Sequence, residues 1–183
     1  MADWRPELTA LAGIQVIDLD GRLVDLVSLW RDRCAVVAFL RHFGCVLCRQ
    51  QAVELGALRS EIAERGAALV VIGSGTHAQA RGFVETFVFA GEVYVDPKRE
   101  AFQALGLYRG VLRTLGPSSL WQIAAARRAG FRSGRLAGDP WQQGGTFVLG
   151  PGENVRFAYR DRMAGDRARS EDVLGALPAS AAT

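Results

Sequence analysis

The chain has 183 residues, of which 49% are hydrophobic and 22% charged, and its formal net charge is +3. This size and balance predict a single domain over residues 1–183, with a core from about residue 13 to about residue 177 and disordered ends. The basic residues are scattered arginines with Lys98 as the single lysine, and three cysteines are too few for a disulfide-framed domain, so the composition excludes a nucleic-acid binder and a small secreted scaffold.

The sequence shows neither a signal core nor a membrane span. Its first residues, M-A-D-W-R-P-E-L, lack an apolar core, and no apolar run approaches the roughly 20 residues that cross a bilayer. We therefore expect a cytoplasmic protein without membrane contact, whose thiols are reduced at rest.

The first predicted elements are a β-hairpin and a buried strand. Residues Ile14 to Leu26 alternate around Asp20-Gly21, a dipeptide typical of tight hairpin turns. The run from Cys34 to Leu40, C-A-V-V-A-F-L, is apolar throughout. Such a run fits a strand that is covered on both faces, as in the centre of a parallel sheet.

A pair of cysteines, Cys45 and Cys48, follows this strand where a helical pattern begins. Their spacing would place them on one face of the first helical turn. A helix N-terminus presents unpaired N–H groups and a positive dipole end, which lower the pKa of a thiol below its free value of about 8.5. Arg41, His42 and Arg49 add donors or positive charge around the turn, so we predict a dithiol redox site with these three as thiolate-stabilising residues.

Zinc binding and inert packing are the alternatives for the two thiols. His42, His77 or Cys34 could complete a zinc site, but no second pair of ligands at tight spacing follows, so no metal is expected. Free cysteines are also often inert core residues. The succession of strand, turn, Cys-x-x-Cys and helix favours redox chemistry.

The next segments predict alternating helices and strands. Apolar residues at helical spacing from Cys48, a stop at Gly66 and the apolar strand Ala67–Ile72 complete a β-α-β unit, with the cysteines at the carboxyl end of its first strand. The later elements are a helix His77–Phe89 with Val88 facing inward, a strand Val93–Val95, a helix Lys98–Leu105, a helix around Ser118–Arg128, strands Thr146–Leu149 and Val155–Tyr159, and a final helix with its N-cap at Ser170.

The region from Tyr108 to Gln143 is a long basic excursion. Its 36 residues exceed the usual connection of about 4–6, and they carry six arginines against one acid, Asp139. Its apolar side chains favour burial over disorder. We expect a partly mobile cover over the cysteine turn that sets substrate choice, with Trp121 and Trp141 taking part, and an added helix that only seals one end of the sheet is the alternative.

The order of these elements is that of the thioredoxin fold. We therefore predict an α/β fold with a central mixed β-sheet flanked by helices, an N-terminal β-hairpin and a helical insertion before the last hairpin. Three stretches then make the sequence resemble the peroxiredoxin-like (AhpC/TSA-type) family, in the branch that includes prostamide/prostaglandin F synthase. They are F-L-R-H-F-G-C-V-L-C-R, V-D-P-K-R-E-A-F-Q-A-L-G-L at 95–107 and G-R-L-A-G-D-P-W-Q-Q-G-G-T-F-V-L-G-P-G at 134–152.

The resemblance implies a thiol-dependent reductase of a small-molecule peroxide or endoperoxide. It implies no bound cofactor and electrons that pass from NADPH through thioredoxin or a similar donor. Typical members carry Pro-x-x-x-Thr-x-x-Cys, but neither cysteine here is preceded by that Pro and Thr, and Gly144 replaces the later motif arginine. Rapid reduction of hydrogen peroxide is therefore not expected.

From the residues themselves we predict a redox cycle through a Cys45–Cys48 disulfide. Cys45, at the more exposed start of the helix, is the expected nucleophile, and Cys48 resolves. The peroxiredoxin register instead permits Cys48 to attack first. A general protein-disulfide reductase and a non-enzymatic redox-sensing protein are the alternative functions. We expect a monomer or a homodimer.

Overall fold

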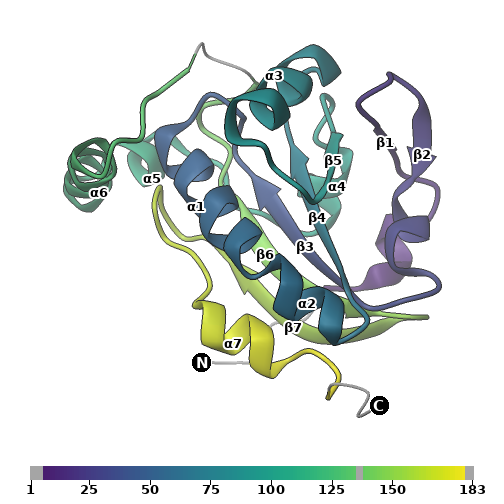
Figure 1. Cartoon of the computed structure of the whole chain (residues 1–183). Coiled ribbons are helices and arrows are strands. Elements are labelled where there is room, and N and C mark those ends of the chain that lie inside the picture. The colour runs from purple at the N-terminus through teal and green to yellow at the C-terminus, as the bar shows by residue number, and fades with distance from the viewer. Residues whose placement is uncertain (1–5, 135–137, 180–183) are drawn as a thin grey trace.

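The computed structural model describes residues 6–134 and 138–179 around a mixed seven-stranded β-sheet (Figure 1). The strand order is β2-β1-β5-β4-β3-β6-β7, in which β3, β4 and β5 run parallel and the other pairings are antiparallel. The strands are β1 (Gln15–Ile17), β2 (Leu23–Asp25), β3 (Ala35–Leu40), β4 (Ala68–Gly73), β5 (Glu92–Val95), β6 (Gly145–Gly150) and β7 (Asn154–Arg160). The prediction of disordered ends falls mainly on residues 1–5 and 180–183, which lie outside the described residues.

The predicted N-terminal hairpin is confirmed. β1 and β2 pair with Val16 opposite Val24. The turn between them is held by the Asp18 carboxylate, which accepts hydrogen bonds from the backbone N–H groups of Asp20 at 2.8 Å and Arg22 at 2.9 Å. Two 3₁₀ helices that the sequence pattern did not indicate flank the hairpin, η1 (Leu8–Leu11) and η2 (Leu26–Trp30).

The central strand β3 supplies side chains to two cores, one on each face of the sheet. Val36, Ala38 and Leu40 lie in the core under α1 (Val46–Ala57), α2 (Arg59–Glu64), α3 (His77–Phe87), α6 (Pro117–Arg128) and α7 (Ser170–Gly175). Ala35, Val37 and Phe39 lie in the core under η1, η2 and α4 (Glu100–Ala104). Because side chains alternate along a strand, the continuous apolar run predicted from the sequence is what both cores require.

Helix boundaries differ from the predictions at three points. The helix expected from Cys48 to Gly66 is divided at Leu58, which caps the end of α1 and the start of α2. The prediction that Val88 faces inward is wrong, because α3 ends at Phe87 and Val88 adopts a left-handed φ of 49° that leaves its side chain 85% exposed. The N-cap of α7 is Arg169 and not Ser170.

The excursion after α4 forms two helices, the unpredicted α5 (Val111–Leu115) and the predicted α6, and then returns to the sheet. Its return is anchored by Asp139, whose carboxylate pairs with Arg99 and, at 2.7 Å, with Arg109 Nε. The backbone N–H of Asp139 also donates to Ser74 Oγ at 3.2 Å. These contacts bring residues 139–144 to the carboxyl end of β3.

Candidate active site

Cys45 and Cys48 lie where the chain leaves β3 and turns into α1. Cys45 is the N-cap residue of α1, with φ −74° and ψ 126°, and Cys48 lies in its first turn. Phe43 anchors the turn in the core, because its buried ring packs against Phe83 with centroids 5.3 Å apart. A Cβ at Gly73 would collide with the same ring, so the close approach of the turn to β4 depends on that glycine. Both cysteines are free thiols.

The two thiols have opposite acidities. A hydrogen bond from Cys48 lowers the pKa of Cys45 to about 6, and the charge of Arg41 and the first backbone amides of the helix act in the same direction against burial. The same hydrogen bond, together with burial and the charge on Cys45, raises the pKa of Cys48 well above its ordinary value. The pair at neutral pH is therefore a thiolate at Cys45 with a neutral thiol at Cys48 beside it.

Arg41 and Arg49 both act on Cys45. Arg41, at the end of β3, is buried and donates to Gln143 Oε1 at 3.5 Å, and its charge lowers the pKa of both cysteines. Arg49, on α1, donates from Nε to the Phe43 carbonyl at 2.8 Å. Burial lowers the pKa of Arg49, and the Cys45 thiolate acts against this, which shows that the two charges interact. These two arginines surround the turn with positive charge.

His42 does not add a positive charge to the site. Burial, with Arg41 and Arg49 next to it, lowers the pKa of His42 to about 4, so its imidazole is neutral at physiological pH. Its buried Nδ1 has no hydrogen-bond partner among the described residues. The backbone of His42 does contribute, because its hydrogen bond to Cys48 favours that thiolate. Of the donor or positive charge that the sequence allowed for His42, the structure therefore has the backbone donor and a neutral imidazole.

A short segment after α6 covers the cysteine turn. The N–H of Gly134 donates to the Gly44 carbonyl at 2.9 Å, and Arg49 Nη1 donates to the Arg132 carbonyl at 3.0 Å. Cys45 is 9% exposed and Cys48 6%, so Cys45 is the more exposed of the two, as expected, but both are buried. Residues 132–134 of the long excursion are thus bound to the cysteine turn.

Neither tryptophan predicted in the cover forms part of this segment. Trp121 is 67% exposed on α6 and lies under the guanidinium of Arg128, 5.6 Å from its carbon. Trp141 is partly buried near the sheet edge, where its carbonyl accepts from the Gly110 N–H at 2.9 Å. Ala126 of α6 belongs to the core and Ile123 packs against it, whereas the Trp121 side chain lies largely in solvent.

Comparisons with known proteins bear on the whole chain. Residues 54–163 match the family described as AhpC/TSA antioxidant enzyme. Thioredoxin-like protein AAED1, chloroplastic, from Arabidopsis thaliana is 40% identical over 91% of this chain and 71% of that protein. Peroxiredoxin-like 2C from Bos taurus is 35% identical over 94% of this chain and 80% of that protein. Prostamide/prostaglandin F synthase from Homo sapiens is 35% identical over 88% of this chain and 83% of that protein.

The chain belongs to the AhpC/TSA antioxidant enzyme family. It is a peroxiredoxin-like thiol oxidoreductase, and the resemblance noted from the sequence is confirmed. The crystal structure of peroxidoxin BcpB from Mycobacterium tuberculosis has a TM-score of 0.63 over 89% of this chain and 88% of that chain, at 20% identity. That likeness confirms the predicted thioredoxin-like fold. The family match begins nine residues after Cys45, so the roles of the two cysteines stay predictions.

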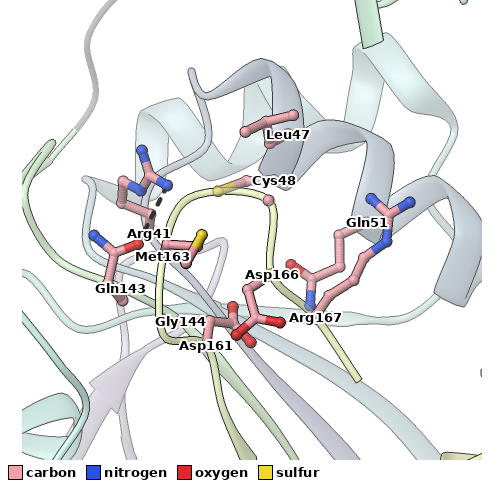
Figure 2. A pocket seen from close by; sticks show the side chains of 11 residues that line it. Arg41, Leu47, Cys48, Gln51, Gln143, Gly144, Asp161, Met163, Asp166 and Arg167 are labelled. Atoms are coloured by element: carbon pink, nitrogen blue, oxygen red, sulfur yellow. Dashed lines mark hydrogen bonds between the residues drawn. The ribbon is translucent and has the colours of Figure 1, made fainter. Parts of the chain in front are cut away.

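This AhpC/TSA-type enzyme has a small polar cavity of about 10 Å³ behind Cys48 (Figure 2). Arg41 and Gln143 line one side of it, and Asp161, from the end of β7, lines the floor. Gln143 is held in place because its Nε2 donates to Thr114 Oγ1 at 2.9 Å. The sequence analysis missed Gln143 and Asp161, and a polar residue directly after the alternating strand β7 was the one available signal for Asp161.

The packing around Gly144 accounts for the absence of the motif arginine at that position. A Cβ at Gly144 would collide with the Phe39 carbonyl oxygen and come within 2.8 Å of Asp161 Oδ2. No side chain therefore fits at Gly144 in this fold, and the arginines that line the cavity are Arg41, which follows β3, and Arg167.

No three His, Cys, Asp or Glu side chains of residues 6–134 and 138–179 are grouped so that they could hold a metal ion. None of the helices in the same residues is long and apolar enough to cross a membrane.

Proposed function

We propose that this enzyme reduces a peroxide or an endoperoxide through a Cys45–Cys48 dithiol and disulfide cycle. The observation that supports the proposal most is the asymmetry of the pair, a thiolate with a pKa of about 6 at Cys45 beside a neutral thiol at Cys48. A thiolate is the attacking species, and a neighbouring thiol is what the second step needs.

In the proposed first step, the Cys45 thiolate attacks one peroxide oxygen and the O–O bond breaks. With a hydroperoxide, Cys45 becomes a sulfenic acid and the other oxygen leaves as an alkoxide that takes up a proton. The Cys48 sulfur then attacks Cys45, the S–S bond forms, and the sulfenic OH leaves as water with the Cys48 proton. With an endoperoxide, both oxygens stay on the product, which is released as a diol.

The proposed reductant is a thioredoxin-like dithiol that receives its electrons from NADPH. We also place the cycle in a reducing compartment, the cytoplasm, because a cycle through a disulfide needs a steady supply of reducing dithiol. Burial of Cys45 and Cys48, at a turn to which Gly134 is hydrogen-bonded, favours a small substrate over a protein disulfide. Arg41 and Arg49 stabilise the thiolate in this scheme.

Single-turnover oxidation tests the proposal. The reduced protein is mixed with one equivalent of an alkyl hydroperoxide, an endoperoxide or a protein disulfide, and the loss of two thiols is followed with mass spectrometry of the product. We expect a Cys45–Cys48 bridge that forms fastest with the peroxide or the endoperoxide. Cys34→Ser is the control, since Cys34 lies at the opposite end of β3 from the cysteine turn and its loss should leave the rate unchanged. Faster oxidation by the protein disulfide, or a bridge to Cys34, contradicts the proposal.

A further inference from the structure

The cavity behind Cys48 contains two buried polar atoms of opposite kind that lack partners. Arg41 Nε, a donor, and Asp161 Oδ1, an acceptor, have no hydrogen-bond partner among the described residues. Both side chains line the cavity together with Cys48 (Figure 2), and they are 7% and 6% exposed. A buried polar atom without a partner is unfavourable by about 1–3 kcal/mol, so two of them beside a reactive thiol require a functional explanation.

Three charged side chains act on Asp161, those of Asp166, Arg41 and Arg167. Burial and the charge of Asp166 raise its pKa well above the usual value, whereas Arg41 and Arg167 act against this. Arg167 is already paired with Glu54, at 3.0 Å. Arg41 forms no ion pair with a carboxylate of the described residues, so it is the cation beside Asp161 whose charge is still to be balanced.

Arg41 is also the cation of the dithiol, because its charge acts on both Cys45 and Cys48. In the reduced enzyme the Cys45 thiolate balances the buried guanidinium, and Asp161 can remain a neutral acid. In the disulfide that thiolate no longer exists. The guanidinium would then be a buried charge without an anion, which is strongly unfavourable unless another group nearby ionises.

We infer that Asp161 exchanges a proton with each turn of the dithiol cycle, so that Arg41 is balanced by Cys45 in the reduced enzyme and by Asp161 in the disulfide. The inference rests on the proposed function. Oxidation removes two electrons from the two sulfurs and forms the S–S bond, and the protons of Cys48 and Asp161 pass to the reduced oxidant or to water. Reduction by a donor dithiol breaks the S–S bond and returns both electrons and both protons. Asp161 is a positioning and proton-exchanging residue and does not touch the substrate.

The test is the redox equilibrium between the enzyme and dithiothreitol as a function of pH. Oxidised dithiothreitol takes up two protons with two electrons, so an enzyme that releases two protons gives an equilibrium constant that does not change between about pH 7 and about pH 8. The variant Asp161→Asn releases only the Cys48 proton, and its constant should fall about tenfold per pH unit. A tenfold fall in the unmodified enzyme overturns the inference.

Asp96→Asn is the matched control. Asp96 is also buried, at 2% exposed, but its carboxylate is bound by the backbone N–H groups of Glu100 and Ala101 at 3.1 and 2.9 Å, apart from the cavity. This variant should keep the constant independent of pH. If Asp161→Asn does not fold, the infrared difference spectrum of the unmodified enzyme decides. Oxidation should remove one protonated-carboxyl band, and an unchanged carboxyl region overturns the inference.

The dithiothreitol test uses no peroxide, so the two ideas fail separately. A bridge that forms with oxidised dithiothreitol but with no peroxide or endoperoxide contradicts the proposed function and leaves the proton count to be read from the pH series. If the unmodified enzyme turns over peroxide but its equilibrium constant with dithiothreitol falls tenfold per pH unit, only the role of Asp161 is contradicted. Absence of any Cys45–Cys48 bridge contradicts both.

Discussion

Cys45 and Cys48 carry the same side chain, and their positions on α1 make them chemically different. Cys45, at the N-cap, faces the open end of the helix and the charge of Arg41, whereas Cys48 in the first turn faces the closed cavity. The residue-scale prediction of a dithiol came from local spacing and helix electrostatics. Asp161 could not be predicted in the same way, because it is more than a hundred positions along the chain and only the sheet brings it to the cavity.

The order of attack can be read from two variants. Cys48→Ser should leave a Cys45 that reacts with a hydroperoxide and remains as a sulfenic acid or mixed disulfide, because the resolving thiol is gone. Cys45→Ser should lose the fast first step, because the Cys45 thiolate is gone and burial still raises the pKa of the remaining Cys48 thiol. Trapping with a sulfenic-acid reagent and mass spectrometry distinguishes the two. A sulfenic acid on Cys48 in the Cys45→Ser protein, formed at the rate of the parent, reverses the assignment.

The pH dependence of alkylation should follow the Cys45 thiolate. Because the pKa of Cys45 is lowered to about 6, its rate with iodoacetamide should rise through that pH and be constant above it. Arg41→Gln removes a charge that favours the thiolate and should move the midpoint upward. Arg59→Gln is the control, because Arg59 is exposed on α2, and it should leave the midpoint unchanged. A Cys45 midpoint near the free-thiol value would rule out the thiolate on which the proposed function depends.

At the scale of elements, the strands were predictable and the long excursion was only partly so. The apolar runs of β3 and β4 and the turn at Asp20-Gly21 are local signals that the structure confirms. α6 was expected, but the sequence did not show which of its faces is buried. Its apolar residues are spread around the helix, and Leu120 and Trp121 are both exposed. The cover therefore depends on backbone contacts at residues 132–134, which no sequence pattern indicates.

Loosening this cover should change access to Cys45 more than its acidity. Arg49→Leu removes the hydrogen bonds to the Phe43 and Arg132 carbonyls, so Cys45 should react several-fold faster with a bulky maleimide at a pH where it is fully ionised. Trp121→Leu should not change this rate, because Trp121 points to solvent. Stopped-flow alkylation measures both. Equal acceleration in the two variants would return Trp121 to the cover.

At the scale of the whole molecule, the site depends on the packing of the central strand. Phe39 is 1% exposed, and its ring meets those of Phe102 and Phe147 edge to face, with centroids 5.1 and 5.8 Å away. Phe39→Ala should lower the free energy of unfolding by about 3–5 kcal/mol, because it removes a buried aromatic ring and leaves a cavity. Urea denaturation measures this. Val88→Ala, at an 85% exposed position, should change it by less than about 0.5 kcal/mol, and similar losses in both would contradict the core assignment.

The two outer strands of the sheet bear on how copies of the protein can associate. β2 is only three residues long, and the chain turns from it directly into η2. β7 places Arg156 on the outer rim, where the guanidinium binds the Ala176 carbonyl at 2.6 Å and so ties the end of α7 beside the strand. A short strand at one rim and a charged, partly occupied strand at the other are poor templates for the addition of a foreign strand. Self-association by a continuous intermolecular sheet, and the fibrous aggregation that follows from it, is therefore disfavoured, and a homodimer would have to form through side-chain surfaces.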